Sequence, residues 1–259
     1  MLPDALRTAL AAPERLVIAV SGGVDSLTLA AAAAEARPAG TFTLCHAQSP
    51  AVPAQALARV TELAEQRGLT VRVVDAGEFA DPAYRANPVN RCFFCKSNLY
   101  GTLSRMGGCA ASGTNLDDLG DYRPGLEAAA DHDVLQPFVA AGMGKEAVRA
   151  LARALGLGAV AELPSSPCLA SRVRTGIRIE AEALGRIDRI ETALRDHLGN
   201  VALRCRQDEA GLTIEIEAAA LERLSLAERE ALAALAGRLG AGADVPLRPY
   251  VRGSAFVHA

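Results

Sequence analysis

A short turn near the start of the chain carries the residue types that bind phosphate. The apolar run Leu16–Val20 leads into Ser21-Gly22-Gly23-Val24-Asp25-Ser26, and an alanine-rich helix former follows. The first N–H groups of a helix have no internal partner and lie at the positive end of its dipole, and glycine lets the backbone approach an anion closely. Ser21 and Ser26 add hydroxyl donors, while Asp25 is a candidate helix cap or a ligand for a metal ion that accompanies the phosphates. The turn therefore predicts a phosphate site; the alternative is a strand–helix turn that merely needs glycine.

Three cysteines are candidates for sulfur or metal chemistry. Cys92 and Cys95 are three residues apart, a spacing that suits one metal ion, a redox pair or a zinc knuckle. Cys168 follows Pro167 and supplies a third thiol. Three thiolates can hold three corners of a [4Fe–4S] cluster and leave one iron open for an added sulfide, whereas a closed zinc site normally takes four ligands. Two ordinary buried thiols at a helix start remain the alternative for the first pair. The other cysteines fall within strand patterns and are expected in the core: Cys45, Cys109 and Cys205.

Polar residues follow a later strand of small residues at 109–113. Gly113, Thr114 and Asn115 are candidates for binding nucleotide or pyrophosphate, and Asp117 with Asp118 could hold Mg²⁺. A simple polar turn is the alternative.

Two arginines offer a guanidinium to a phosphate or carboxylate. Arg123 precedes a Pro-Gly pair, and Arg172 follows Ser171 close to Cys168. Lys96 is a candidate for contacting released pyrophosphate, and His46, at a strand end, is predicted to be structural.

The elements that must position these residues alternate between strands and helices. Apolar runs predict strands at 16–20, 41–46, 69–74 and 109–113, and the periodic segments between them predict helices at 3–12, 26–36, 55–67, 91–106 and 144–155, with a loop at 76–91. This order predicts an α/β fold with a doubly wound parallel sheet. Ligands bind such sheets at the carboxyl ends of the strands, where the turn at 21–26 falls.

The pattern changes after about residue 173. A charged amphipathic helix is predicted at 180–198, and strands are predicted at 201–206 and 212–217. Apolar and polar residues alternate in both strands, so one face of each strand should be exposed to solvent. A further helix to about 239 and a last strand near 245–251 follow. We therefore expect two domains, 1–173 and a smaller α+β domain at 174–259.

Composition limits the class of protein. The 259 residues carry a formal net charge of −3, which argues against a general nucleic-acid binder. We identify no export signal at the N-terminus and no apolar run of transmembrane length. We expect a cytoplasmic protein without a membrane or nucleic-acid partner, whose cysteines are thiols, metal ligands or catalysts rather than disulfides.

Taken in order, these motifs resemble one family. The hexapeptide at 21–26 lacks the lysine and the length of a Gly-x-x-x-x-Gly-Lys-Ser/Thr loop and resembles the PP-loop of ATP pyrophosphatases. The whole set is similar to the ATP-dependent sulfur transferases that mature the nickel-pincer nucleotide cofactor of lactate racemase, best over residues 15–175. The remaining motifs of the set are Arg91-Cys-x-x-Cys-Lys96, Gly113-Thr-Asn115, Asp121-Tyr-Arg-Pro-Gly125 and Pro167-Cys-Leu-Ala-Ser-Arg172.

The resemblance implies a PP-loop ATP pyrophosphatase domain and a reaction. ATP adenylates a carboxylate of pyridinium-3,5-biscarboxylic acid mononucleotide, pyrophosphate leaves, and sulfur displaces AMP to give a thiocarboxylate. It implies ATP and Mg²⁺ as cofactors, a homo-oligomer, and catalytic roles for Asp25, Arg172 and Cys168. The nucleotide would be held by Ser21, Gly22, Gly23, Val24, Asp25, Ser26, Gly113, Thr114, Asn115 and Asp117, and the substrate by Arg123, Ser171 and Arg172.

The family has two branches. One sacrifices the sulfur of the cysteine that matches Cys168 and leaves dehydroalanine; the other holds a [4Fe–4S] cluster with an added sulfide on three cysteines. Cys92, Cys95 and Cys168 are all present, so the chain resembles the cluster branch. The Val-Arg-Thr-Gly stretch at 173–176 departs from the turn expected in the sacrificial branch.

Three other functions fit parts of the pattern. A PP-loop tRNA thiolase with a cluster should carry a basic face, and the acidic balance counts against it. An amidating synthetase of the same fold leaves the three cysteines unexplained. A non-catalytic nucleotide-binding sensor with a structural or regulatory metal would bind ATP without releasing pyrophosphate.

Overall fold

The chain divides into two compact units. The computed structural model describes residues 1–120, 123–164, 167–199, 201–242, 244–251 and 253–255. The first unit contains Met1–Asp81 and Asn90–Ser166, and the second contains Pro82–Val89 and Pro167–Ala259. Each unit is described by itself.

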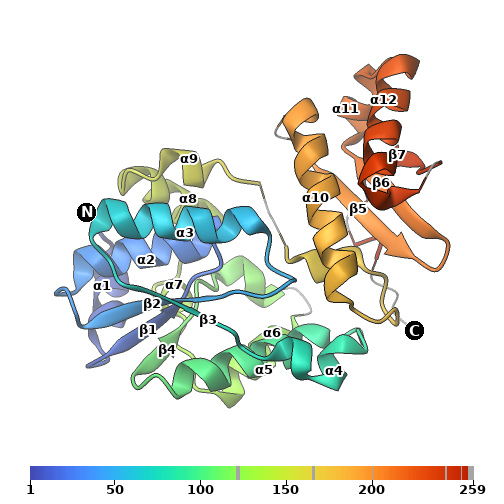
Figure 1. Cartoon of the computed structure of the whole chain (residues 1–259). Coiled ribbons are helices and arrows are strands. Elements are labelled where there is room, and N and C mark those ends of the chain that lie inside the picture. Colours follow the sequence, from blue (N-terminus) through green and yellow to red (C-terminus); the bar gives the residue numbers. More distant parts are fainter. Residues whose placement is uncertain (121–122, 165–166, 200, 243, 252, 256–259) are drawn as a thin grey trace. The chain divides into compact units, whose positions relative to one another are not determined.

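A parallel sheet forms the centre of the first unit. Its strands are β1 (Leu16–Ala19), β2 (Phe42–Ala47), β3 (Val71–Val74) and β4 (Cys109–Ala111), in the order β3-β2-β1-β4 (Figure 1). All three pairings are parallel, with Ile18 opposite both Leu44 and Ala111. The predicted α/β class with a parallel sheet is confirmed, and the doubly wound, PP-loop type stays a prediction.

Helices cover both faces of this sheet. Leu16 and Ile18 of β1 pack in one core, whereas Val17 packs in the other, because successive side chains of a strand point to opposite faces. The first core contains side chains from α1 (Asp4–Ala11), α2 (Val24–Ala36), α3 (Ala54–Arg67), α7 (Pro137–Ala140), α8 (Lys145–Ala154) and α9 (Gly158–Ala161). The second contains side chains from α5 (Arg91–Ser104) and α6 (Pro124–Asp131). Burial on both faces explains why the strand at 16–19 is apolar without alternation.

The segment predicted as a loop at 76–91 is partly helical. It contains the 3₁₀ turn η1 (Glu78–Ala80) and the short helix α4 (Pro82–Arg85). Proline at the first helical position has a φ angle that already suits a helix, and Pro82 begins α4. A second 3₁₀ turn, η2 (Leu116–Gly120), follows β4.

The second unit combines three strands with helices. β5 (Leu203–Asp208) and β6 (Gly211–Ile216) form an antiparallel hairpin, and β7 (Leu247–Pro249) pairs parallel to β6. The other elements are η3 (Leu169–Arg172), α10 (Ala181–Leu198), α11 (Ala218–Arg223), α12 (Leu226–Ala236) and the π-helical turn η4 (Gly237–Ala241).

The expected wet face of the hairpin is wrong at one end. Arg204 is buried between two buried neighbours of β5, and Glu215 is buried between two of β6. The Arg204 guanidinium lies 5.5 Å from the centre of the Tyr250 ring, and Glu215 accepts hydrogen bonds from Arg206 and Ser254. The alternation of apolar and polar residues correctly separates the two faces of the hairpin, but the polar residues of the outer face are covered by other side chains.

Two of the three predicted core thiols are buried. Cys45 and Cys205 lie in the core, and burial raises the pKa of Cys45 to about 11 against the opposing charge of Arg72. Cys109 is exposed, which contradicts the prediction, because it is the first residue of β4 at the edge of the sheet. In the part of the chain that the structure describes, no helix is long and apolar enough to cross a membrane.

Candidate functional site

The turn at 21–26 is held together by its own serines. It follows β1, an inner strand of the sheet, and α2 starts directly after its second glycine. The buried Ser26 hydroxyl accepts from the amide of Ser21 at 3.1 Å and donates to the carbonyl of Gly23 at 3.1 Å. The Ser21 hydroxyl lies 3.2 Å from it and is exposed. Ser26 therefore shapes the turn, while Ser21, half-buried Gly23 and half-buried Asp25 are accessible to a ligand.

The two glycines of the turn have different requirements. Gly22 has φ +74°, and a Cβ there would lie 2.5 Å from the carbonyl oxygen of Ala56, so only glycine fits. The Nε of Arg59 donates to the Gly22 carbonyl at 2.7 Å, which ties α3 to the turn. Gly23 has ordinary φ, and the nearest atom to its Cβ position is the Ser21 Oγ at 3.7 Å. The fold therefore requires glycine at position 22, whereas the missing side chain of Gly23 leaves open space at the start of α2.

His46 has the structural contacts that the sequence predicted. It is fully buried in β2, and its Nδ1 lies 2.8 Å from the carbonyl oxygen of Val20, the residue before the turn. The contact joins the ends of two neighbouring strands.

The polar segment after β4 lies directly against the turn. A Cβ on Gly113 would be 2.8 Å from the backbone of Asp25 and 2.9 Å from that of Ser26. Next to it, the Thr114 hydroxyl lies 2.9 Å from that of Ser112. The two predicted nucleotide-binding segments thus lie against each other, and the absence of a side chain at Gly113 permits their approach.

Two buried polar atoms at this contact make no well-formed hydrogen bond. Among the described residues, neither Oδ1 of Asp25 nor Nδ2 of Asn115 has a hydrogen-bond partner, although the Asn115 side chain is fully buried. Burial raises the pKa of Asp25 and the Asp118 carboxylate adds to this, whereas the charges of Lys145 and Arg149 and the nearby Asn115 amide oppose it. A buried oxygen short of partners fits a Mg²⁺ ligand, and a buried amide donor fits an acceptor on a nucleotide.

The remaining acidic and basic residues of this segment hold one another. The Asp117 carboxylate accepts from the amide of Lys145, the first residue of α8, and Asp118 pairs with Arg123 at 2.9 Å. Asp117 is therefore a helix cap, and a metal-binding role for it stays a prediction. Asp121 and Tyr122 of the predicted motif lie outside the described residues.

The three candidate cysteines belong to different units. Cys92 and Cys95 are half-buried at the start of α5 in the first unit, where a spacing of three places them on one helix face. Cys168 is exposed before η3 in the second unit. Considering only the residues that the structure describes, no group of three or more His, Cys, Asp or Glu side chains could hold a metal ion. The pair fits two ligands of a cluster, and the set of three stays a prediction.

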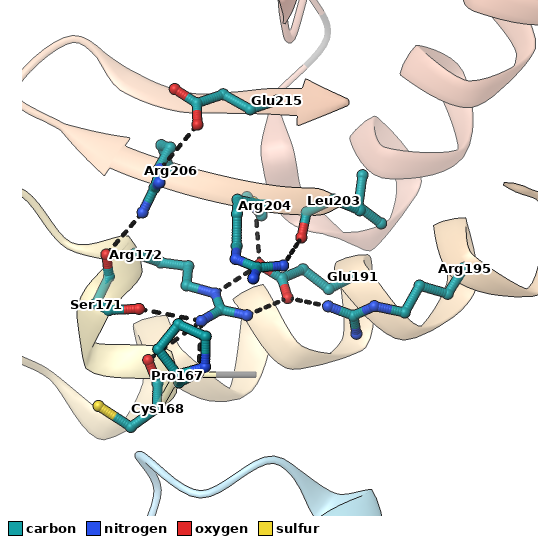
Figure 2. A network of polar contacts seen from close by, with 11 residues as sticks. Pro167, Cys168, Ser171, Arg172, Glu191, Arg195, Leu203, Arg204, Arg206 and Glu215 are labelled. Atoms are coloured by element: carbon teal, nitrogen blue, oxygen red, sulfur yellow. Dashed lines mark hydrogen bonds and ion pairs between the residues drawn. The ribbon is translucent and has the colours of Figure 1, made fainter. Parts of the chain in front are cut away.

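A buried ion pair fixes the backbone beside Cys168. Arg172 and Glu191 are almost completely buried, and Nε and Nη2 of Arg172 each donate to a different carboxylate oxygen of Glu191 at 2.8 Å. Nη1 of Arg172 donates to the carbonyl oxygens of Pro167 at 2.7 Å and Cys168 at 3.2 Å, and to the Ser171 hydroxyl at 3.0 Å. Figure 2 shows the Cys168 thiol pointing away from this network.

Arg172 and Ser171 therefore have structural contacts as well as predicted roles in binding. Burial disfavours the charged form of Arg172, but the hydrogen bonds and charge of Glu191 raise its pKa. Burial likewise disfavours the charged form of Glu191, but Arg172 first, then Arg195 and the Cys205 amide, lower its pKa. The pair stays ionised and holds the turn; contact of Arg172 with substrate stays a prediction.

Glu191 is not among the residues predicted from the sequence, although the pattern carries a signal for it. Within α10, Ile187, Glu191 and Leu194 follow the i, i+4, i+7 spacing of one helix face, and all three are buried. A carboxylate on the apolar face of a helix requires a buried partner. The pattern does not identify that partner, because Arg172 lies outside the helix.

No protein-family model matches the chain. An uncharacterized protein of Synechocystis is 36% identical over 208 residues, which cover 78% of this chain and 76% of that protein. An uncharacterized protein of Methanocaldococcus jannaschii is 29% identical over 79% of this chain and 78% of its own length. The pyridinium-3,5-bisthiocarboxylic acid mononucleotide synthase of Lactiplantibacillus plantarum is 27% identical over 74% of this chain and 71% of the synthase. The chain belongs to the family of the Synechocystis protein and is a distant homologue of the Lactiplantibacillus plantarum synthase.

Proposed function

We propose that the protein is an ATP-dependent sulfur transferase acting on pyridinium-3,5-biscarboxylic acid mononucleotide. The distant homology to the bisthiocarboxylic acid mononucleotide synthase supports a related sulfur-transferase function and an enzyme of the transferase type. The structural observation that carries the proposal is a pair of buried polar atoms, Oδ1 of Asp25 and Nδ2 of Asn115, that make no well-formed hydrogen bond and lie beside a glycine turn at a helix start.

In the first step, a carboxylate oxygen of the substrate attacks the α-phosphorus of ATP. The bond between that phosphorus and the bridging oxygen of pyrophosphate breaks, leaving an acyl adenylate and pyrophosphate. The amides at the start of α2 would bind the phosphates, and Asp25 would hold Mg²⁺, which screens the developing charge. The hydroxyl of exposed Ser21 and the amide of half-buried Gly23 would meet this ligand.

In the second step, a sulfur nucleophile attacks the activated carbonyl carbon. The C–O bond to AMP breaks, AMP leaves with the electron pair, and a C–S bond forms. When the nucleophile is the Cys168 thiolate, the product is a thioester with this residue; loss of the Cα proton to a base and cleavage of the Cβ–S bond then release the thiocarboxylate and leave dehydroalanine at position 168. The exposed thiol of Cys168 is the candidate nucleophile on this chain, and the Arg172–Glu191 pair keeps its backbone fixed. A [4Fe–4S] cluster on Cys92, Cys95 and Cys168 would supply sulfide instead, as in the cluster branch.

The two steps can be tested separately on the full-length protein. With ATP, Mg²⁺ and the biscarboxylate mononucleotide, the wild type should release pyrophosphate only when substrate is present, and mass spectrometry should detect the thiocarboxylate. Cys168→Ala should still release pyrophosphate but form no thiocarboxylate, whereas Asp25→Asn should lose both. ATP binding without substrate-dependent pyrophosphate release would instead identify a nucleotide-binding sensor.

The source of the sulfur needs its own measurement. Iron and acid-labile sulfide should be quantified in protein purified without oxygen, beside Cys92→Ala, Cys95→Ala and Cys168→Ala. About four irons per chain, lost in each variant, is the result expected of a cluster on three thiols. Cluster-free protein that cannot be reconstituted would leave Cys168 as the sulfur donor, and a mass loss at this residue after turnover would identify it.

A further inference from the structure

The backbone of the turn at 21–26 is tied to α3 by one arginine. The Nε of Arg59, a half-buried side chain of α3, donates to the carbonyl oxygen of Gly22 at 2.7 Å. Arg59 lies 37 residues from Gly22 in the sequence and belongs to none of the motifs found there. Neither step of the proposed reaction uses this side chain, so its effect on the turn is a separate question.

The helix α3 holds this donor in a fixed place. Val60 and Leu63 pack in the core that also contains the alanines of α2. The carbonyl oxygen of Ala56 lies 2.5 Å from the position that a Cβ on Gly22 would take. Residues three apart lie on one face of a helix, so Ala56 and Arg59 both face the turn. The bond to Gly22 therefore comes from a helix that is itself anchored in the core.

The same bond fixes the direction of the peptide between the two glycines. This peptide bond is trans, so its carbonyl oxygen and its N–H point in opposite directions. Because the Gly22 carbonyl points toward Arg59, the Gly23 amide points away from that side chain. The Gly23 amide makes no hydrogen bond to any residue that the structure describes. It is therefore available to donate to a phosphate.

Two successive glycines leave this peptide with little resistance to rotation. Glycine has no Cβ and populates positive and negative φ about equally, so the chain itself does not select one orientation. In the reversed orientation the Gly22 carbonyl oxygen would take the place of the Gly23 amide and repel a phosphate. The Ser26 hydroxyl bonds the Ser21 amide and the Gly23 carbonyl, which belong to the peptides on either side. These serine contacts therefore leave the orientation of the central peptide to Arg59.

We propose that Arg59 is a positioning residue for ATP, whose Nε holds the peptide between Gly22 and Gly23 with its amide directed at the phosphates. The inference rests on the proposed binding of ATP at this turn. It assigns the effect to the N–H donor rather than to the positive charge, because the acceptor is a peptide carbonyl. An amide that is already oriented does not have to rotate when phosphate binds or when pyrophosphate leaves.

Two substitutions separate the donor from the charge. The amide nitrogen of glutamine takes the chain position of the arginine Nε, whereas methionine has a methyl group there, and both side chains are uncharged. Calorimetric titration with ATP, pyrophosphate and AMP, each with Mg²⁺, is carried out on the full-length wild type, Arg59→Gln and Arg59→Met. Arg67→Met is the matched control, because Arg67 belongs to the same helix and donates to the carbonyl of Leu155. Circular dichroism verifies folding, and Arg59→Ala, which also lacks the donor, replaces the methionine variant if that variant does not fold.

Arg59→Met should weaken ATP and pyrophosphate about tenfold or more, the value of one hydrogen bond to a charged group, and leave AMP within about twofold. Arg59→Gln should restore both affinities to within about threefold of the wild type. Equal losses in the two variants would assign the effect to the charge and overturn the inference. Unchanged affinities in Arg59→Met, an equal loss for AMP, or an equal effect of Arg67→Met would also overturn it.

Failure of the proposed function gives a different result. If the wild type binds ATP and pyrophosphate but releases no pyrophosphate with substrate, the proposed reaction fails, and the same titrations still decide whether Arg59 positions the turn. A wild type that binds neither ligand would overturn the inference itself, because the turn would then hold no phosphate.

Discussion

At the scale of single residues, the least expected feature is a charge pair in the core of the second unit. Arg172 and Glu191 have side chains 1% and 0% exposed. Transfer of either charge out of water is costly, and only the partner and the surrounding hydrogen bonds offset it. The presence of the pair therefore does not by itself indicate a high free energy of unfolding, but removal of one member leaves an uncompensated buried charge.

We predict that Arg172→Gln and Glu191→Gln each lower the free energy of unfolding by about 3–5 kcal/mol, the usual cost of breaking a buried pair. Arg174→Gln is the matched control, because Arg174 pairs with Glu209 at the surface, where the loss should be at most about 1 kcal/mol. Urea denaturation of the three variants measures the difference. Similar small losses in all three would show that the buried pair does not support the unit.

The same pair predicts a dependence on pH. Because the pKa of Glu191 is lowered on folding, its contribution is complete above the pKa of an unfolded glutamate, about 4.3, and is lost as the pH falls through the lowered folded value. The stability difference between wild type and Glu191→Gln should therefore be constant at neutral pH and shrink in acid. A difference that is the same at neutral pH and in strong acid would contradict the assignment.

At the scale of elements, local pattern predicted the first unit well. The apolar run and the alanine-rich segment predict β1 and α2 to within two residues, because each element is determined by its own residues. The meeting of Gly113 with Asp25 was also predictable, since both follow strands of one parallel sheet.

Long-range partners were not predictable from the same patterns. The spacing of α10 places Glu191 on its apolar face but does not name Arg172, and the alternation of β5 does not show that Tyr250 covers Arg204. The exposure of Cys109 depends on the order of the strands, which places β4 at an edge. Each of these features depends on residues that are distant in the sequence.

Asp117 caps the start of α8 and is also a predicted Mg²⁺ ligand, and two substitutions distinguish these roles. We expect Asp117→Ala to lower the free energy of unfolding by about 1 kcal/mol, the usual value of a helix N-terminal cap. Asp117→Asn keeps an acceptor for the Lys145 amide and should lose less, with unchanged Mg²⁺-dependent ATP affinity. Thermal unfolding and ATP titration measure both effects. Loss of Mg²⁺-dependent affinity in the asparagine variant would instead support the metal-binding role.

At the scale of the whole molecule, the segment Pro82–Val89 contributes to the second unit although first-unit residues flank it on both sides. Asn87 is one anchor of this segment. It is fully buried with φ +54°, and its side-chain amide donates to the carbonyls of Arg174 at 2.8 Å and Ile177 at 2.9 Å. Asparagine accepts this left-handed conformation more readily than most residues.

We predict that Asn87→Gly, which keeps the backbone conformation accessible, destabilises the second unit by about 1–3 kcal/mol, because the hydrogen bonds from the buried Asn87 amide to the carbonyls of Arg174 and Ile177 are lost. Hydrogen-exchange mass spectrometry should show faster exchange around 174–180 and little change in β1 and α2. Asn98→Ala is the matched control, since Asn98 bonds Asp81 and Phe94 within the first unit. Equal effects of both variants on both units would show that Asn87 does not hold this segment to the second unit.

The path of the chain between the units also determines the order in which the protein can fold during synthesis. Residues 82–89 leave the ribosome long before the residues around 174–177 that Asn87 binds, so these hydrogen bonds cannot form until the strands and helices of the first unit have been made. Domains generally fold as units as they emerge. A single cut in the gene cannot separate the two units, because the chain passes between them after residues 81, 89 and 166.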